Sequence, residues 1–255
     1  MEMTLLELTE RIFTINFVRY FGFSGAAFIV FYVLLRNRWH RKKIQFVFPS
    51  ASDYRREISY SFITILIFVG VGLIVFATPL RHYNLRYQNI SDHSWGYWVF
   101  SVVAMIFLHD TYFYWLHRAM HHPRVFKILH LVHHKSTNPS PWASYAFHPL
   151  EGVVEASIIF PIAFLIPFHS TALLAFLLFM MAYNVYGHLG FELFPKRFNK
   201  HPIGKWLNTS VNHNLHHKHF NGNYGLYFLF WDRWLGTIRE DYDSSYAEVD
   251  KKRSA

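Results

Sequence analysis

HDTYFYWLHRAMHHPRVFKILHLVHH, residues 109–134, is the stretch on which the interpretation of this chain depends, and HNLHH at residues 213–217 complements it. Imidazole is the commonest metal ligand in proteins and suits zinc, iron, copper and nickel. Side chains three and four residues apart share one face of a helix. The spacing therefore predicts three multidentate faces, formed by His117 with His121, His130 with His133 and His134, and His213 with His216 and His217.

The histidines are more informative as a set than singly. A lone histidine in an aromatic-rich protein is usually a hydrogen-bonded core residue, but packing does not explain two copies of HxxHH and one HxxxH. Burying many imidazoles without partners costs a few kcal/mol each, whereas a metal satisfies the ring nitrogens directly. His188, with Asn184 one helical turn earlier, adds a polar pair at the end of an apolar block. Together these residues predict a metal centre.

The apolar residues of this 255-residue chain occur in long blocks rather than in amphipathic stripes. Hydrophobic residues make up 52% of the composition and charged residues only 16%. Each block is about the length that crosses or dips into a bilayer. A soluble protein of this size has too small a core to bury helices that are apolar all round. The predicted membrane blocks are residues 20–35, 58–80, 97–116, 153–168 and 171–187.

The composition also limits the chemistry of the metal. The sequence contains no cysteine, which excludes disulfides, iron–sulfur clusters and thiolate ligands, so the ligands must be histidine, carboxylate and water. The N-terminal sequence MEMTLLELTERIF is acidic where a signal peptide is basic, so we expect no cleaved signal. The first apolar block should therefore stay attached as a membrane span.

Basic residues predict the topology. Arg36, Arg38, Arg41, Lys42 and Lys43 follow the first block, and the positive-inside rule places this loop in the cytoplasm. The formal net charge of +9 is then a topology signal. It does not indicate nucleic-acid binding, because the cations flank membrane segments and form no separate basic module. Counting the crossings brings all the clustered histidines to the same, cytoplasmic side of the membrane.

The sequence therefore predicts an all-α integral membrane protein with about four to five transmembrane or re-entrant helices. Residues 153–187, broken at Pro167, form either a helical hairpin or a re-entrant pair. The prolyl segment 138–142 is expected to be a simple turn, and the tail from Asp241 to be polar and mobile. A cytoplasmic helical cap should carry a His-rich dinuclear metal site.

Four polar residues near the motifs are candidates for hydrogen bonding to ligand rings. Asp110 lies seven residues before His117 on the same helix face, where its carboxylate either orients a ring or pairs with a nearby cation. His109 is its neighbour in sequence. His148 and Asn184 lie close to the ends of apolar blocks.

Three histidine motifs in this order and separation resemble those of the fatty acid hydroxylase and sterol desaturase superfamily of integral-membrane di-iron oxygenases. HRAMH at His117, HLVHH at His130 and HNLHH at His213 match the three histidine boxes of that family. The segments HDTYFYWLHR, HPLE, GHLGFE and FWDRWLGT add to the likeness, which covers about residues 95–237. The sequence around the first box favours the sterol-desaturase-like branch.

The resemblance implies a lipid hydroxylase or desaturase with two iron ions, O2 as co-substrate and electrons from a separate cytoplasmic reductase, ferredoxin or cytochrome. The basic inner loop would dock an acidic donor of this kind. The implied domains are N-terminal membrane helices with the basic loop (1–95), a catalytic domain (96–240) and a polar tail (241–255). The implied metal ligands are His117, His121, His130, His133, His134, His188, His213, His216 and His217.

Two other classes of function stay open from the residues alone. A membrane zinc hydrolase needs three protein ligands, a water molecule and a general base, but the HExxH arrangement is absent. A non-catalytic metal-handling or transport protein would carry polar residues throughout its spans, whereas here they gather at one end. Sterol-like, fatty acyl and related lipids all suit an apolar entrance, so the sequence does not choose the substrate.

Overall fold

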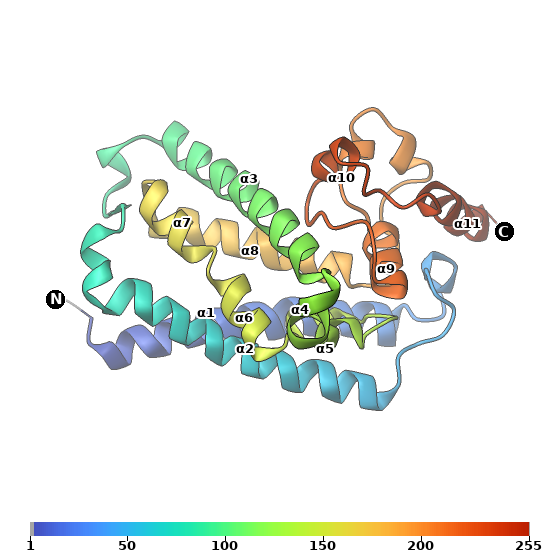
Figure 1. Ribbon diagram of the computed structural model, residues 1–255, viewed down its shortest axis with the longest axis horizontal. Coiled ribbons are helices and arrows are strands. Elements are labelled where there is room, and N and C mark those ends of the chain that lie inside the picture. Colours follow the sequence, from blue (N-terminus) through green and yellow to red (C-terminus); the bar gives the residue numbers. More distant parts are fainter. Residues whose placement is uncertain (1–2, 255) are drawn as a thin grey trace.

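Four long helices form the body of the protein in the computed structural model, which describes residues 3–254. All four are long and apolar enough to cross a membrane, which confirms the predicted fold class. Figure 1 shows them extended along the long axis of the molecule, where α1 contacts α2 and α8, and α3 contacts α8. They are α1 (Leu5–Phe28, continued as a π-helical segment Ile29–Leu34), α2 (Ala51–Ala77), α3 (Trp95–Met120) and α8 (Ser170–Gly187).

Shorter elements connect and cap these helices. In Figure 1 the helices α4, α5, α9, α10 and α11 gather at the end of the body opposite the N-terminus. Two short strands pair in parallel and join the loop after α2 to the loop before α8. The short elements are β1 (Arg86–Tyr87), α4 (Pro123–Leu129), α5 (Leu131–His134), a 3₁₀ turn (Pro141–Tyr145), α6 (Pro149–Ala156), α7 (Ile159–Leu165), β2 (Phe168–His169), α9 (Ser210–His219), α10 (Phe230–Trp234) and α11 (Tyr242–Ser254).

Local sequence signals explain where the helices begin. Thr4 and Ser50 each start a long helix with a capping box, in which their side chains accept from backbone N–H groups that the helix leaves unpaired. Pro123 and Pro149 occupy the first positions of α4 and α6, where the missing N–H group costs nothing. Pro79 follows directly after the cap of α2 and begins a tighter 3₁₀ turn.

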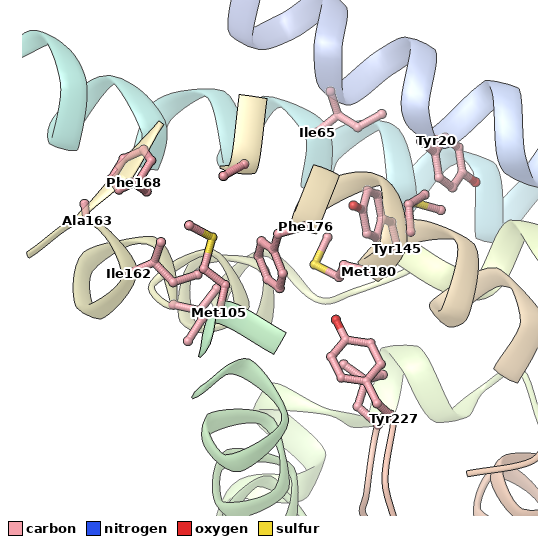
Figure 2. Close-up of a cluster of buried hydrophobic side chains, with 14 of the residues drawn as sticks. Tyr20, Ile65, Met105, Tyr145, Ile162, Ala163, Phe168, Phe176, Met180 and Tyr227 are labelled. Atoms are coloured by element: carbon pink, nitrogen blue, oxygen red, sulfur yellow. The ribbon is translucent and has the colours of Figure 1, made fainter. Parts of the chain in front are cut away.

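The core lies between the long helices, and their outer faces are apolar too. Figure 2 shows Tyr20, Ile65, Met105, Phe176 and other buried side chains meeting in this core. Large apolar side chains also cover the outside of α2, α3 and α8 and are well exposed, among them Leu66, Ile74, Val99, Phe100, Val103, Phe107, Leu174 and Leu178. Exposed apolar surface of this extent suits contact with lipid rather than water. The protein is thus a multi-pass membrane protein.

Three sequence expectations differ in detail from the structure. Residues 153–187 contain one long helix, α8, preceded by the short helices α6 and α7, because the chain leaves the helix after Ala156. The prolyl segment forms a buried 3₁₀ turn that contributes Tyr145 to the core. As far as Ser254, the tail that was expected to be mobile forms α11, which buries Tyr242, Tyr246 and Val249 against Val211 and Leu215 of α9.

Glu57, buried near the start of α2, fixes the loop that follows the second histidine motif. Its carboxylate accepts from the hydroxyl of Ser136 at 2.7 Å and from the hydroxyl of Ser140. Arg56 adds a hydrogen bond to Ser136 at 3.1 Å. These hydrogen bonds satisfy a carboxylate that water does not reach, and they tie residues 136–140 to a long helix. The histidines just before this loop are thereby held against the body.

Candidate metal centre

Nine buried or nearly buried histidines converge in two separate groups. Within each group, one nitrogen of every ring lies within 4.8 Å of the corresponding nitrogens of the others. The first group has five members, His117, His121, His130, His134 and His216. The second has four, His133, His188, His213 and His217. The sequence had singled out these same nine residues, and the structure brings all of them together.

Helix geometry explains how adjacent residues serve different groups. In α5 and α9, His134 and His216 belong to the first group, whereas their neighbours His133 and His217 belong to the second. Residues four apart stay together, as His213 and His217 do, because their side chains lie one above the other. The sequence predicts one multidentate face for each HxxHH motif, whereas in the structure the histidines of each motif are divided between the two groups. Each HxxHH segment bridges the two groups, and this explains why the pattern carries two adjacent histidines.

The ring nitrogens of the second group are arranged as metal ligands are. The Nε2 atoms of His188, His213 and His217 lie 3.1, 3.1 and 3.2 Å apart in a triangle. Three such contacts cannot all be hydrogen bonds, because each nitrogen carries either a proton or a lone pair and two of the three must be alike. Ligands bound to one ion at about 2.1 Å lie roughly 3.0–4.2 Å apart. The donor set therefore fits a cation.

Hydrogen bonds on the outer side of three of the rings fix the tautomer that leaves Nε2 free to bind a metal. The Nδ1 atoms of His117, His188 and His216 lie 2.9, 2.8 and 2.7 Å from the backbone carbonyls of Tyr224, Asn184 and Gly222. A carbonyl only accepts, so each Nδ1 must carry the proton and each Nε2 a lone pair that faces its group. This is the tautomer that a metal requires.

Burial keeps these rings uncharged. Desolvation lowers the pKa of His121 and of His188 to about 4, and it lowers the pKa of His133 and His217 well below the usual value for histidine. The neighbouring imidazoles lower the pKa of His133 and His217 further. All four rings are therefore neutral near pH 7, and a neutral imidazole is the form that binds a metal.

Glu151, at the start of α6, is hydrogen-bonded to the ring nitrogen of His130 that faces away from the first group. One carboxylate oxygen lies 2.6 Å from Nδ1 of His130, and both side chains are almost completely buried. Burial raises the pKa of Glu151 and lowers the pKa of His130, so without a cation the pair is neutral. A cation on the Nε2 side of the ring would favour a carboxylate that accepts the Nδ1 proton. The sequence analysis quoted Glu151 within HPLE but gave it no role.

The four residues expected to orient ligand rings lie elsewhere or act differently. Asp110 accepts hydrogen bonds from the backbone N–H groups of Tyr227 and Phe228 and contacts no ligand ring. His109 lies 2.8 Å from the Tyr227 hydroxyl. The His148 ring caps the N-terminus of α6.

Asn184 is the one of the four that contacts a ligand ring. It does so through its backbone carbonyl, which accepts from His188. Its side-chain amide donates instead to the carbonyl of Ser144, at 2.8 Å.

A mostly apolar cavity of about 180 Å³ lies between the helices, and aromatic side chains separate it from the histidine groups. Phe113 and Phe147 line it, and their rings pack against His117 of the first group and His133 of the second, with centroids 4.9 and 5.1 Å apart. The cavity extends along α1, α2 and α8 to Ile12 and Phe76. An apolar ligand in this cavity would lie one layer of aromatic side chains away from both histidine groups, in a site with little water.

Comparison with known proteins links this geometry to a family. A family model for fatty acid hydroxylases matches residues 102–237, which hold all nine histidines. Delta(7)-sterol 5(6)-desaturase ERG3B of Gibberella zeae is 30% identical over 188 residues, covering 74% of this chain and 57% of that protein. Lathosterol oxidase of Homo sapiens is 29% identical over 190 residues, covering 74% and 62%.

A second fungal desaturase matches this chain with similar identity and coverage. Delta(7)-sterol 5(6)-desaturase erg3C of Aspergillus fumigatus is 32% identical over 208 residues, covering 74% of this chain and 63% of that protein. The chain thus spans about three fifths of the length of these curated relatives. No solved structure matches the chain.

Proposed function

Because the chain belongs to the fatty acid hydroxylase family, in its sterol-desaturase-like branch, we propose that it is a di-iron oxidoreductase that hydroxylates or desaturates a lipid C–H bond. The observation that carries the proposal is the pair of buried histidine groups beside an apolar cavity. Two iron ions bound there would activate O2. Hydroxylation uses O2, two electrons and two protons to make an alcohol and one water, whereas desaturation yields an alkene and two waters.

The residues of the chain supply positions and a dry environment. The first group would hold one ion and the second the other, with neutral imidazoles that tolerate changes in the oxidation state of iron. Phe113 and Phe147 would form the apolar wall between the lipid and the histidines and would keep water away from both groups. The substrate class, a sterol-like, fatty acyl or related lipid, follows from the apolar lining.

The proposed electron donor is a separate cytoplasmic protein, a reductase, ferredoxin or cytochrome, that docks on the basic loop after α1. Arg38 and Arg41 are exposed there. Lys43 is not available for docking, because its side chain is buried against the rings of Tyr32, Phe48 and Phe191. The proposed docking surface therefore contains fewer basic residues than the sequence suggested.

Replacing Arg38 and Arg41 by Gln should slow reduction by an acidic ferredoxin or cytochrome roughly tenfold at low ionic strength, because steering by surface charge raises association rates. The difference should fade as salt is added. Stopped-flow reduction measures the rate. Arg81→Gln, an exposed arginine in the loop after α2, is the matched control. Equal rates for all variants at every salt concentration would remove the basic loop from the docking surface.

Metal content and O2 use of the purified, iron-reconstituted protein test the function itself. With a chemical reductant and a pooled lipid extract, we expect two iron ions per chain and O2 consumption that depends on lipid. Mass spectrometry should then find a lipid that has gained one oxygen atom or lost two hydrogen atoms. Removing iron with a chelator should stop O2 use, and restoring it should recover the activity. One firmly bound zinc ion with no O2 consumed under any lipid would favour a hydrolase or a metal-handling protein.

A further inference from the structure

Arg19 carries a buried positive charge in the middle of α1. Only 4% of the residue is exposed. Its guanidinium donates to the side-chain oxygen of Asn16 at 2.6 Å and to the backbone carbonyl of Leu177 in α8 at 3.3 Å. The remaining nitrogen, Nε, is buried and has no hydrogen-bond partner. Among residues 3–254, no carboxylate lies within 4.0 Å of this guanidinium, so its charge is not paired by the chain.

Arg19 lies on the wall of the same cavity that Phe113 and Phe147 separate from the histidine groups. Its guanidinium carbon is 5.7 Å from the centre of the Tyr145 ring. Tyr145 in turn contacts Phe147, with ring centroids 6.2 Å apart, and Phe147 packs against His133. Figure 2 shows Tyr145 between the α1 side of the core and Met180. Two aromatic rings therefore separate the charge from the second histidine group.

The remainder of the cavity lining divides into two ends. Toward the histidines lie Phe113 and Phe147, and in the opposite direction the wall is formed by Ile12, Phe76 and Leu173. Apart from Arg19 and Asn16, the side of the cavity formed by α1 and α2 is apolar. The other walls add the polar side chains of His109, Glu155 and Asn184. An amphiphilic ligand would thus find Arg19 and Asn16 on the wall formed by α1, and apolar side chains toward Ile12 and Phe76.

A structural role alone does not account for this charge. A neutral side chain would bridge α1 and α8 without the cost of burying a guanidinium in a membrane span. The Tyr145 hydroxyl is buried beside this guanidinium and has no other polar partner among residues 3–254. Two neighbouring polar side chains on the cavity wall are thus incompletely satisfied, whereas buried polar groups are normally paired. A ligand with an acceptor oxygen would pair both.

We propose that Arg19 and Tyr145 form the binding subsite for the oxygen-bearing group of an amphiphilic lipid, whose apolar body extends past Ile12 and Phe76. The inference rests on the proposed function for the fate of this lipid, but the binding itself does not require turnover. The shared chemistry is a hydrogen-bond-accepting oxygen, which a sterol-type hydroxyl or ketone and a fatty acid carboxylate both offer. The Nε–H group donates to this oxygen, and the Tyr145 hydroxyl completes the contact.

Lipid binding to the wild-type protein in phosphatidylcholine nanodiscs tests the subsite without any variant. Displacement of radiolabelled cholestanol is measured with cholestanol, cholestanone, palmitate and the oxygen-free hydrocarbon cholestane as competitors. A hydrogen bond to a charged group corresponds to roughly a 10- to 100-fold difference in affinity. We therefore expect cholestane to bind more weakly, by this factor, than whichever oxygenated competitor fits the subsite. Preference for cholestanol and cholestanone identifies a ring lipid, whereas preference for palmitate identifies a fatty acid. Equal competition by cholestane overturns the subsite.

Variants assign the preference to Arg19. Arg19→Met keeps the length of the side chain and should abolish the preference for oxygenated lipids while leaving the affinity for cholestane within about twofold. Arg19→Lys retains a donor and should keep part of the preference. Arg11→Met, two turns earlier on the exposed side of α1, is the matched control and should behave as wild type. A preference that survives in Arg19→Met overturns the assignment.

Two further readouts separate this inference from the proposed function. Bound iron should be unchanged in Arg19→Met, which shows that the protein is folded and the histidine groups are intact. If the lipid preference is present but no lipid is oxidised, the proposed function fails and the subsite stands. If a lipid is oxidised and Arg19→Met changes neither KM nor the site of oxidation, the subsite fails and the function stands.

Discussion

His216→Ala and His217→Ala should each remove one of two bound iron ions, although the two residues are adjacent in α9. The ring of His216 lies 3.0 Å from His134 in the first group, and the ring of His217 lies 3.1 Å from His188 in the second. Each substitution therefore deletes a ligand from a different group. Changes that only disturb the orientation of a ligand cost 10- to 100-fold. Loss of a ligand itself should lower lipid oxidation by more than about 100-fold.

Iron per chain, measured by mass spectrometry of the purified variants, checks this expectation, and membrane insertion should be unchanged. His219→Ala is the matched control, because His219 is in the same helix but part-exposed and near Asp241. The double variant His216→Ala and His217→Ala should hold no iron. Two retained ions in both single variants would exclude these histidines from the ligand set. Loss of both ions in either one would indicate a single shared centre instead of two.

The spacing of the histidines in the sequence was sufficient to select eight of the nine rings, because HxxHH and HxxxH place side chains on common helix faces. His188 was selected separately, as a polar residue at the end of an apolar block. It could not divide them between two groups. Residues three and four apart share a face equally well in an isolated helix, and the choice depends on how α5 and α9 face each other. The contact of His133 with His217, with ring centroids 4.6 Å apart, arises only from that packing.

The roles of residues that act through long-range contacts could not be predicted from the sequence. Glu151 meets His130 across 21 positions, and no periodicity links them. Asp110 shares a helix face with His117, as expected, but the face is wide enough for its carboxylate to meet the Tyr227 backbone instead. Arg19 was missed for a different reason. The first apolar block was drawn from residue 20 and left Arg19 just outside it, whereas α1 begins at Leu5 and places this arginine well inside the span.

Glu151→Ala should lower the affinity for iron of the five-histidine group 10- to 100-fold and leave the four-histidine group unchanged. Among residues 3–254, His130 is the one ring to which the Glu151 carboxylate is hydrogen-bonded. Without the carboxylate the ring loses both its orientation and the negative charge that makes it a stronger donor. Glu151→Gln should have a smaller effect, because the amide oxygen still accepts a hydrogen bond but carries no charge.

Titration of iron against a competing chelator resolves the two ions by affinity and separates these outcomes. Glu155→Ala, one turn later in α6 and also buried, is the comparison variant, because among the described residues its carboxylate forms no hydrogen bond with a histidine ring, although its proximity helps to raise the pKa of Glu151. It should change the affinity for iron less than Glu151→Ala does. If Glu151→Ala weakened both ions equally, the carboxylate would be acting on the fold of α6 rather than on His130. If only one ion binds more weakly, and if Glu151→Ala weakens it more than Glu151→Gln does, the carboxylate must orient a ligand of that ion.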